Sequence, residues 1–429
     1  MPAASLIVGQ VVGIGIFLTP AEMARDLGAS GLVYGMWLLT GFMALAGALC
    51  YGELSSRFPE AGGAYVYLRE AWGEPLAFLY GWKCLLVMDP GITAALGVGL
   101  AQYLAYLVPL GEGGRKAAAV AAILSIAALS ALGTRLAAGA LVAITALKLA
   151  MLAVIVVSGL AVAGVDWGRM LPSLDRPASS VPLLAALAGG FVSAFFSFGG
   201  WWEAARMAGE VREPQRNLPR AFVLGIAVVT AVYVLVSAVF LGLVSGSAVA
   251  SADAFAAGVG ERLFGRAGGT VLAAGVIVSV LGSLAAVLLA VPRLYVALAR
   301  DGLLPARLAR THPRLGTPTA AIALQAGMAV LLVAVGTFAD IVAYFVFVTV
   351  GFIAASVAGL YRLPEAGAGF RTPLRRVTPA VFVVLSVLLL ALLLAGRPVQ
   401  ALLGVAVVSL GVPVYAGLRR GGILGVRET

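Results

Sequence analysis

The sequence predicts an all-α membrane protein, and three features support this fold class. Hydrophobic residues make up 62% of the 429 residues and charged residues 11%, whereas a soluble domain carries about 25% charged residues. Apolar runs of about 20 residues recur along the chain, and each is long enough to cross the hydrocarbon core of a bilayer. The runs are continuously apolar rather than alternating, which favours helices over a β-barrel.

Twelve candidate transmembrane helices lie between the turn signals of the sequence. The stretches 55–75 and 300–318 are too polar to cross a membrane and are expected at the cytoplasmic surface, and 251–265 is expected to be an outer loop with some helical character. No stretch resembles a separate soluble domain, so 1–429 is expected to form a single transmembrane domain. The expected spans are 3–27, 32–56, 75–108, 117–133, 138–164, 183–209, 219–245, 268–298, 318–336, 339–361, 378–395 and 399–418.

The distribution of lysine and arginine predicts the orientation of the chain. With a cytoplasmic N-terminus, basic residues favour the cytoplasmic loops by roughly two to one, in agreement with the positive-inside rule. This pattern accounts for the net charge of +10 without a nucleic-acid partner, because the arginines gather in alternate loops rather than in one stripe. We therefore expect a multi-pass protein in the lipid bilayer of the cell (inner) membrane, with both termini cytoplasmic.

Metal sites and catalytic triads are not expected. His312 is the single histidine and lies in a polar loop, while Cys50 and Cys84 lie inside apolar segments. These residues provide neither a cluster of metal ligands nor a pair of nucleophile and base. We therefore expect no metal, no cofactor and no enzyme activity.

Two of the predicted helices contain closely spaced glycines, although glycine in a helix interior costs about 1 kcal/mol relative to alanine. Gly13 and Gly15 interrupt the first span, and Gly199 and Gly200 interrupt the sixth. Five spans separate the interruptions, so they occupy matching positions in two halves, and an odd number of helices in each half makes the halves inverted. Paired interruptions of this kind indicate the central site of a transporter.

Two other interpretations of these glycines compete with the transporter site. A dinucleotide-binding motif needs a preceding strand and a third glycine, but position 18 is leucine, so this interpretation is disfavoured. A packing face of small residues, on which another helix can approach closely, explains either glycine pair alone and stays open. Matched pairs in both halves favour interrupted helices.

Unwound backbone at membrane depth exposes N–H and C=O groups that have no helical partner, and this is tolerated only beside a polar cavity or a ligand. A half-helix that starts near Ile16 would direct amide groups and a positive dipole end at the gap, which suits a carboxylate. Half-helices that end near Val12 and Phe196 would offer carbonyl groups, which suit an ammonium group. Opposite charges held this close together describe an α-amino acid.

The chain resembles the amino acid–polyamine–organocation (APC) superfamily, most closely its L-type amino acid transporter branch and the bacterial relatives of that branch. The resemblance covers almost the whole chain and rests on four motifs in family order, GIGIFLTPAEMA, GALCYGELSSRFPEAGGAYVYLREAWG, FSFGGWWEAARMAGEVREPQRNLPRA and PRLYVALARDGLLPARLARTHPRLGTP. It implies a LeuT-type fold of two inverted five-helix repeats, 1–164 and 183–361, with discontinuous helices 1 and 6 and two peripheral helices at 378–418. It also implies sodium-independent secondary transport of amino acids by alternating access, as an exchanger or a proton-coupled symporter.

The same resemblance implies which residues bind the substrate. Phe196 matches the aromatic gating position of the family. Gly13-Ile14-Gly15 replaces the usual Gly-Ser-Gly, so a hydroxyl group near the substrate carboxylate is lost. Trp202 follows the second interruption closely and is predicted either to line the site or to pack against other helices. The predicted substrate-binding set is Val11, Val12, Gly13, Ile14, Gly15, Phe196, Ser197, Phe198, Gly199 and Trp202.

Lys148 lies about ten residues into its predicted span, or ~15 Å deep. A buried ammonium group there costs about 2.5 kcal/mol or more and indicates a function, although a lysine side chain can also reach back to the membrane surface. In the family that the chain resembles, this lysine takes the place of a sodium ion, and the matching hydroxyl group is that of Ser283. Carbonyl groups between Val12 and Gly15 are expected as further acceptors, and a role in proton coupling is open.

Two acidic residues leave the substrate class open. Asp89 stands in the third span, where the L-type branch commonly has a basic residue, and Glu203 lies just beyond the second interruption. Each could hold a cationic substrate side chain, or each could pair internally, Asp89 with Lys83 and Glu203 with Arg206. The alternative function is therefore that of a basic amino acid or polyamine antiporter.

A third function class is a membrane receptor that senses a substrate without transporting it. Such a receptor normally needs a signalling domain or a long tail, and the sequence shows neither. The expected partner is a small-molecule substrate, an amino acid. Because neither cysteine is expected outside the membrane, the disulfide-linked ancillary subunit of animal relatives is not expected here.

Overall fold

The computed structural model describes most of the chain, and every regular element in the described residues is a helix. The described residues are 8, 11–58, 62–133, 138–161, 166–176, 182–203, 213–243, 254–300, 302–364 and 369–420. The α-helices are α2 Gly15–Leu27, α3 Ser30–Arg57, α4 Ala64–Trp72, α5 Glu74–Lys83, α6 Asp89–Leu107, α7 Glu112–Ala131, α8 Ala138–Ala161, α9 Trp167–Met170, α10 Leu183–Phe198, α11 Pro214–Leu243, α13 Phe255–Ala290, α14 Pro292–Arg300, α15 Thr319–Val335, α16 Phe338–Ala358, α17 Val377–Gly396, α18 Pro398–Ser409 and α19 Gly411–Arg420. A π-helical turn, η1 Cys84–Met88, joins α5 to α6, and η3 Ala306–Ala309 and η4 Gly359–Tyr361 are short 3-10 turns.

Ten helical segments of the described residues are long and apolar enough to cross a membrane, and α15 is a shorter apolar helix. An all-helical, multi-pass membrane protein is therefore confirmed, while the count of twelve spans and the inverted repeat stay predictions. More of the expected outer loop 251–265 is helical than its polarity suggested, because Phe255, Ala257 and Val259 are buried against the core. Gly265, with a φ of 71°, kinks α13 within that stretch.

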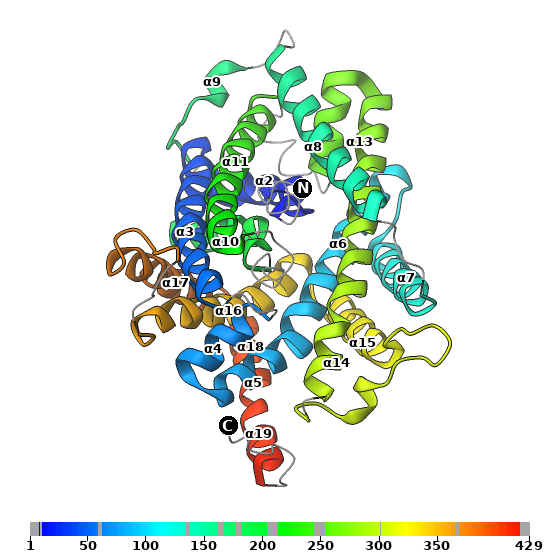
Figure 1. Cartoon of the computed structure of the whole chain (residues 1–429). Helices are drawn as coiled ribbons and strands as arrows, with labels where there is room; N and C mark the ends of the chain where they lie inside the picture. The colour runs from blue at the N-terminus through cyan, green and yellow to red at the C-terminus, as the bar shows by residue number, and fades with distance from the viewer. Residues whose placement is uncertain are drawn as a thin grey trace.

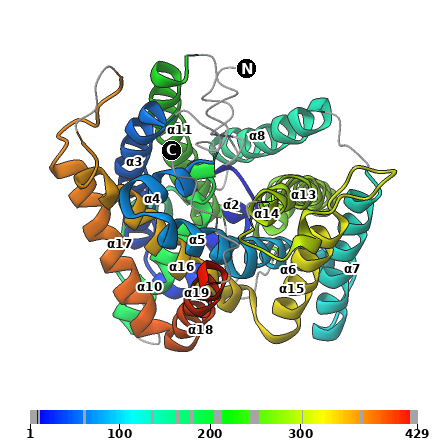
Figure 2. The same cartoon turned by 60° about the horizontal axis from the view of Figure 1, so that its bottom comes forward.

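The helices form two groups on either side of α2 (Figure 1). One group contains α3, α10, α11 and α17, and the other contains α6, α7, α13 and α15. The view from below shows the same division, with α2 again near the centre (Figure 2). The short helix α2 therefore lies where the two groups meet, and it packs most closely against α10.

Both predicted interruptions are present in the described backbone. The N–H of Val12 closes a helical turn by donating to the carbonyl of Val8 at 2.8 Å, and α2 then begins at Gly15. Helix α10 ends at Phe198, and Gly200 follows with a φ of 107°. A short 3-10 turn occupies 201–203. The chain is thus unwound at two places in the interior of the helix assembly.

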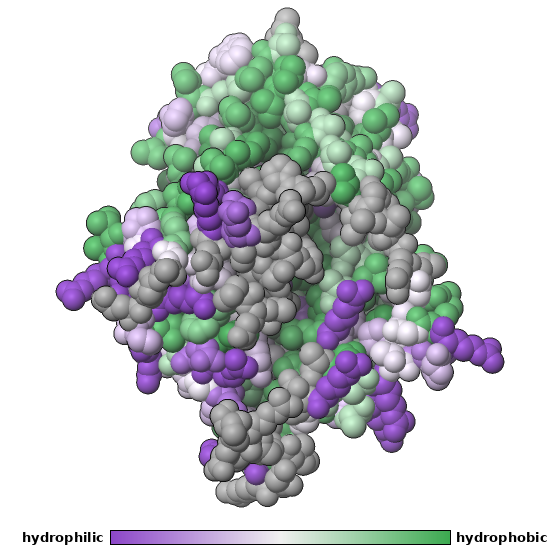
Figure 3. Space-filling view, viewed as in Figure 1, coloured by the Kyte–Doolittle hydropathy of each residue, from purple (hydrophilic) through white to green (hydrophobic). Residues whose placement is uncertain are grey.

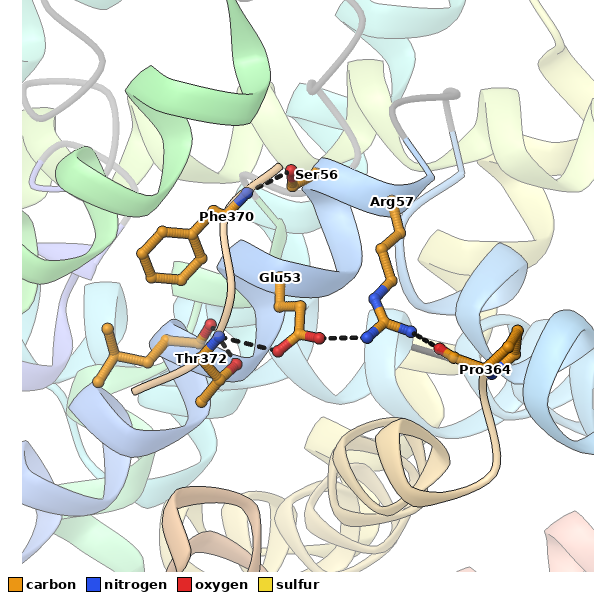
Figure 4. A network of polar contacts seen from close by, with 7 residues as sticks. Glu53, Ser56, Arg57, Pro364, Phe370 and Thr372 are labelled. Atoms are coloured by element: carbon orange, nitrogen blue, oxygen red, sulfur yellow. Dashed lines mark hydrogen bonds and ion pairs between the residues drawn. The ribbon is translucent and has the colours of Figure 1, made fainter. Parts of the chain in front are cut away.

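A polar network fastens the end of α3 to the segment before α17 (Figure 4). Glu53 is 0% exposed and accepts a hydrogen bond of 2.8 Å from the backbone N–H of Thr372. Arg57 forms an ion pair with Glu53 and donates to the carbonyl of Pro364 at 2.7 Å. The buried carboxylate is therefore both paired and hydrogen-bonded, as a buried charge requires.

Hydrophilic side chains gather over the lower part of one face, near α4, α14 and α15, whereas the upper part of that face is largely apolar (Figure 3). The basic segment 300–318 follows α14 in the chain. This distribution agrees with a segment outside the membrane. Which side of the membrane it faces stays a prediction.

Candidate functional site

A cavity of about 590 Å³ lies beside the two interruptions. Its walls come from the start of α2, the end of α10, η1, α6, α8, α13 and α16, so both helix groups contribute. Of the residues that the sequence singles out, the cavity is lined by Val11, Gly13, Ile14, Gly15, Lys148, Phe196, Ser197, Gly199, Trp202, Glu203 and Ser283.

Three of the predicted residues do not line this cavity. Val12 and Phe198 are each 1% exposed, and their side chains belong to the hydrophobic core. Asp89 is also 1% exposed, and its Oδ2 accepts a hydrogen bond of 2.8 Å from the hydroxyl of Tyr295. The geometry therefore does not support substrate contacts by these side chains, and their predicted roles stay predictions.

The remaining charges near the cavity lie in different surroundings. Glu203 lines the cavity from the 3-10 turn after α10, and its expected partner Arg206 lies outside the described residues. Lys83 is 1% exposed, and its Nζ lies 2.8 Å from Met88 Sδ and 4.6 Å from the centre of the Tyr80 ring. Lys83 therefore sits between a thioether and an aromatic face.

The two glycines of the first interruption have different surroundings. A Cβ atom on Gly15 would lie 2.6 Å from Ser197 Oγ and 2.7 Å from Ser197 Cα, so Gly15 permits the close contact of α2 with α10. Among the described residues, a Cβ atom on Gly13 would meet only the Val11 carbonyl, at 3.8 Å. The space beside Gly13 is therefore open on the cavity side. Gly15 is therefore needed for the close packing of α2 against α10, whereas Gly13 leaves the backbone exposed to the cavity.

Two hydroxyl groups join the interrupted helices. Thr19 Oγ and Ser197 Oγ lie 2.7 Å apart, and they also lie 3.0 Å from the carbonyls of Gly15 and Ser193, respectively. Two hydroxyl protons cannot serve three hydrogen bonds at once. When one hydroxyl donates to the other, one of the two carbonyls therefore receives no hydroxyl proton. Thr19 could not be identified from the sequence, because a single threonine among apolar residues forms no recognisable pattern.

Lys148 and Ser283 meet across α8 and α13. Lys148 is 5% exposed, its Nζ donates to Ser283 Oγ at 2.8 Å, and Ser283 donates onward to the carbonyl of Ser279 at 3.1 Å. Within the described residues the hydrogen-bond partner of Lys148 is Ser283, and the expected contact with the carbonyls of 12–15 stays a prediction. The ammonium group lies closer to α13 than to the interrupted helix.

The ring of Phe196, which lines the cavity, packs against two aromatic rings of α16. The ring of Phe196 packs edge-on against Phe338 at 5.5 Å and against Phe345 at 5.9 Å. The first turn of α16, which carries Phe338, is fixed because Asp340 accepts a hydrogen bond of 2.6 Å from Arg397. Phe196 therefore joins α10 to α16 beside the cavity, and its gating role stays a prediction.

Two polar groups in the cavity wall have no hydrogen-bond partner among the described residues. They are Trp202 Nε1 and Thr349 Oγ1, in side chains that are 6% and 1% exposed. A buried polar group left unpaired costs about 1–3 kcal/mol, so such groups in a cavity wall indicate a bound ligand. Trp202 is one of the residues predicted from the sequence, whereas Thr349 is not, because it is a lone hydroxyl group in an apolar helix.

Both cysteines, Cys50 and Cys84, are buried thiols. In the ranges that the structure describes, no three His, Cys, Asp or Glu side chains gather as metal ligands would. His312 lies apart from the cavity in the turn after α14, where its Nδ1 accepts hydrogen bonds of 3.3 Å from the N–H groups of Arg314 and Leu315.

Comparisons with known proteins show the family to which this chain belongs. The family profile described as "Amino acid permease" matches residues 2–410. The chain is 28% identical over 428 residues to the serine/threonine exchanger SteT of Bacillus subtilis, covering 97% of this chain and 95% of that protein. It is 29% identical over 422 residues to the human large neutral amino acids transporter small subunit 2, covering 96% of this chain and 78% of that protein. It is 27% identical over 423 residues to the human cystine/glutamate transporter, covering 96% and 83%. This chain is therefore a membrane transporter of the amino acid permease family.

Proposed function

We propose that the protein carries neutral α-amino acids across the cell (inner) membrane without sodium, by alternating access, with both termini cytoplasmic. The observation that carries this proposal is the cavity formed where both interrupted helices meet. Family membership supports amino acid transport. The substrate class, the coupling and the orientation are inferred from the residues around the cavity and from the charge distribution.

The backbone at the interruptions supports a zwitterionic substrate. Helix α2 begins at Gly15, and its first N–H groups and positive dipole end lie beside the open space at Gly13. The carbonyl groups of Val11 and Ser197 belong to residues that line the same cavity. A carboxylate near the start of α2 and an ammonium group near these carbonyls would satisfy both sets of groups.

The rest of the cavity supports an uncharged substrate side chain. The wall contributed by η1, α6 and α16 contains Met88, Ile92, Leu96, Phe345 and Val346. A volume of about 590 Å³ falls within the usual range for small-molecule sites. An aliphatic or small polar side chain would fit against this wall, and the unpaired groups of Trp202 and Thr349 would add contacts.

Lys148 supports transport without sodium. Its ammonium group is held between α8 and α13 by the contact of 2.8 Å with Ser283. A permanent cation in this position would do what a bound sodium ion does elsewhere, which is to join two helices in one state and release them in another. Exchange and proton symport are both compatible with this arrangement.

A carrier for basic amino acids or polyamines is the second candidate, because Glu203 lines the cavity. A carboxylate there could hold a cationic side chain. Lys148 lines the same cavity and would repel that side chain. Neutral substrates are therefore favoured.

Transport by purified protein in proteoliposomes tests the proposal. We would measure uptake of labelled L-leucine, L-serine and L-lysine in sodium-free buffer, with and without internal unlabelled amino acid, and with and without an inward proton gradient. Uptake of L-leucine or L-serine without sodium is expected. Stimulation by internal amino acid would identify an exchanger, and stimulation by the proton gradient a symporter. A requirement for sodium would contradict the coupling, and preference for L-lysine would favour the second candidate.

A further inference from the structure

The segment 302–317, here called the basic platform, joins α14 to α15 and is fixed to the helices at its start. Its leucines Leu303, Leu304 and Leu308 are buried in a hydrophobic cluster that also contains Phe78 of α5 and Leu298 of α14. The N–H of Leu303 donates to the carbonyl of Leu298 at 2.9 Å. The chain that follows α14 is therefore held in place by apolar packing and is not a loose connection.

The far end of the basic platform is fixed to α7. Thr317 Oγ donates to the carbonyl of Ala131, the last residue of α7, at 2.6 Å. Thr317 also accepts a hydrogen bond of 2.8 Å at its carbonyl from the N–H of His312, so the turn between these two residues is closed. Figure 2 shows the segment running from α14 towards α7. Both ends of the platform are thus attached to membrane helices.

Exposed leucines place the platform relative to the bilayer. Leu129 and Leu132, at the end of α7, are 47% and 62% exposed, and Leu315 on the platform is 41% exposed. Apolar side chains exposed at the end of a membrane helix face the acyl chains, so α7 leaves the hydrocarbon core at this level. The platform, which is bonded to this end of α7, therefore lies at the level of the lipid headgroups.

The exposed charges of the platform are all positive. Arg307, Arg310 and Arg314 are exposed, and the stretch 302–316 contains no aspartate or glutamate. Within the described part of the chain, the ion pairs include none of these three arginines. Hydrophilic side chains stand out from this part of the surface, near α14 and α15, in Figure 3. Guanidinium groups that no carboxylate neutralises are suited to bind phosphate oxygens, which they can contact with two N–H groups at once.

We propose that the basic platform is a binding surface for the headgroups of anionic phospholipids, with Arg307, Arg310 and Arg314 as the groups that contact phosphate. Three observations carry this proposal: the platform is fixed at both ends, it lies at headgroup level, and its exposed charges have one sign. Clusters of basic residues beside a membrane helix attract anionic lipids, whereas zwitterionic lipids carry no net charge for them to attract. The proposal holds for whichever leaflet the platform faces, and it does not depend on which substrate the carrier moves.

The test compares two double variants, Arg310→Gln with Arg314→Gln and Arg262→Gln with Arg266→Gln. Arg262 and Arg266 are also exposed and also four positions apart, but they lie near the start of α13, at the opposite end of that helix from α14. Each double variant removes two exposed positive charges, so the change in net charge is matched between them. A third double variant, Arg310→Lys with Arg314→Lys, keeps the charges and changes only the side chains that carry them.

We would measure the affinity of the purified full chain, in a neutral detergent, for fluorescently labelled phosphatidylglycerol, with unlabelled lipids or inorganic phosphate as competitors. Each arginine near anionic headgroups contributes about fivefold to binding, so the Arg310→Gln, Arg314→Gln variant should bind about tenfold more weakly or worse. The α13 variant and the lysine variant should stay within about threefold of wild type. Unlabelled phosphatidylglycerol should displace the label, whereas phosphatidylcholine and inorganic phosphate at the same concentration should not. Thermal unfolding should be the same in all three variants, because no ion pair of the described structure is removed.

Equal affinity of the wild-type protein for phosphatidylglycerol and phosphatidylcholine would overturn the inference. Unchanged affinity of the Arg310→Gln, Arg314→Gln variant would also overturn it, and so would equal losses in this variant and the α13 variant, because binding would then follow net charge and not the platform. Displacement of the label by inorganic phosphate as readily as by phosphatidylglycerol would contradict a lipid ligand and indicate a site for free phosphate. Each of these outcomes leaves the proposed transport of amino acids untouched.

Discussion

Replacing Lys148 with methionine should slow transport strongly while leaving the fold intact. The substitution removes the ammonium group and keeps a side chain of similar volume. The lost hydrogen bond to Ser283, 2.8 Å long, contributes about 1.5–3 kcal/mol as a bond from a charged donor. Burying a lysine at the centre of a membrane costs about 2.5–3.5 kcal/mol, so the two contributions nearly cancel in the folded protein. Ser283 keeps its own bond to the Ser279 carbonyl, and no buried hydroxyl is left unpaired.

The effect on transport should be larger than the effect on stability. If the contact between Lys148 and Ser283 exists in only one state of the cycle, its loss shifts the balance between states by about 1.5–3 kcal/mol. This corresponds to about tenfold to 150-fold in an equilibrium constant, so we expect turnover of Lys148→Met to fall at least about tenfold. Thermal unfolding in detergent should change little.

Lys83→Met is the matched control, because Lys83 is equally buried but is not one of the residues that line the cavity. It removes the same charge from the membrane interior and should leave turnover within about threefold of wild type. The assay is uptake of L-leucine into proteoliposomes in sodium-free buffer. A fully active Lys148→Met variant would refute the reasoning. Stimulation of wild-type uptake by sodium would also refute it, because the lysine would then not stand in for the ion.

Three further predictions concern the walls of the cavity. Phe196→Ala should reduce transport more than binding of L-leucine, because the ring is expected to cover the bound substrate, and equal losses in the two assays would exclude a gate. Gly15→Leu should destabilise the protein, because the leucine side chain would collide with Ser197. Gly13→Leu should fold normally and lose substrate binding. A lower unfolding temperature for Gly13→Leu than for Gly15→Leu would contradict the assigned roles. Thr349→Val should leave thermal stability unchanged or raise it, because the hydroxyl has no partner in the described structure. The same variant should bind L-serine more weakly. Unchanged affinity for L-serine would exclude a contact between Thr349 and the substrate.

The sequence predicts the helices and the interruptions well, because both depend on local properties. Long apolar runs have to become helices in a bilayer, where every backbone hydrogen bond is satisfied within the segment. The glycines at 13 and 199 mark the ends of half-helices that the structure also shows. The start of α13 at Phe255 is harder to predict, because the helical stretch before Gly265 is shorter and more polar than a transmembrane helix.

Contacts between distant helices are less predictable from a single sequence. Lys148 and Ser283 are 135 positions apart, and only the resemblance to a family pairs them. Thr349 is a single polar residue in an apolar helix, so neither periodicity nor charge distinguishes it from residues that face lipid. Which way Asp89 points depends on the rotation of its helix within the assembly, and hydropathy does not determine that rotation where a helix is apolar on all sides.

A structure of the protein determined with L-leucine in sodium-free buffer tests the central claim most directly. The claim is that the exposed backbone of the two interrupted helices binds a zwitterionic amino acid. The predicted result is L-leucine in the cavity, with its carboxylate at the N–H groups where α2 begins, its ammonium group at the carbonyls of Val11 and Ser197, and its side chain against Met88. L-leucine bound elsewhere, or bound in this cavity with its charged groups away from both interruptions, would contradict the account.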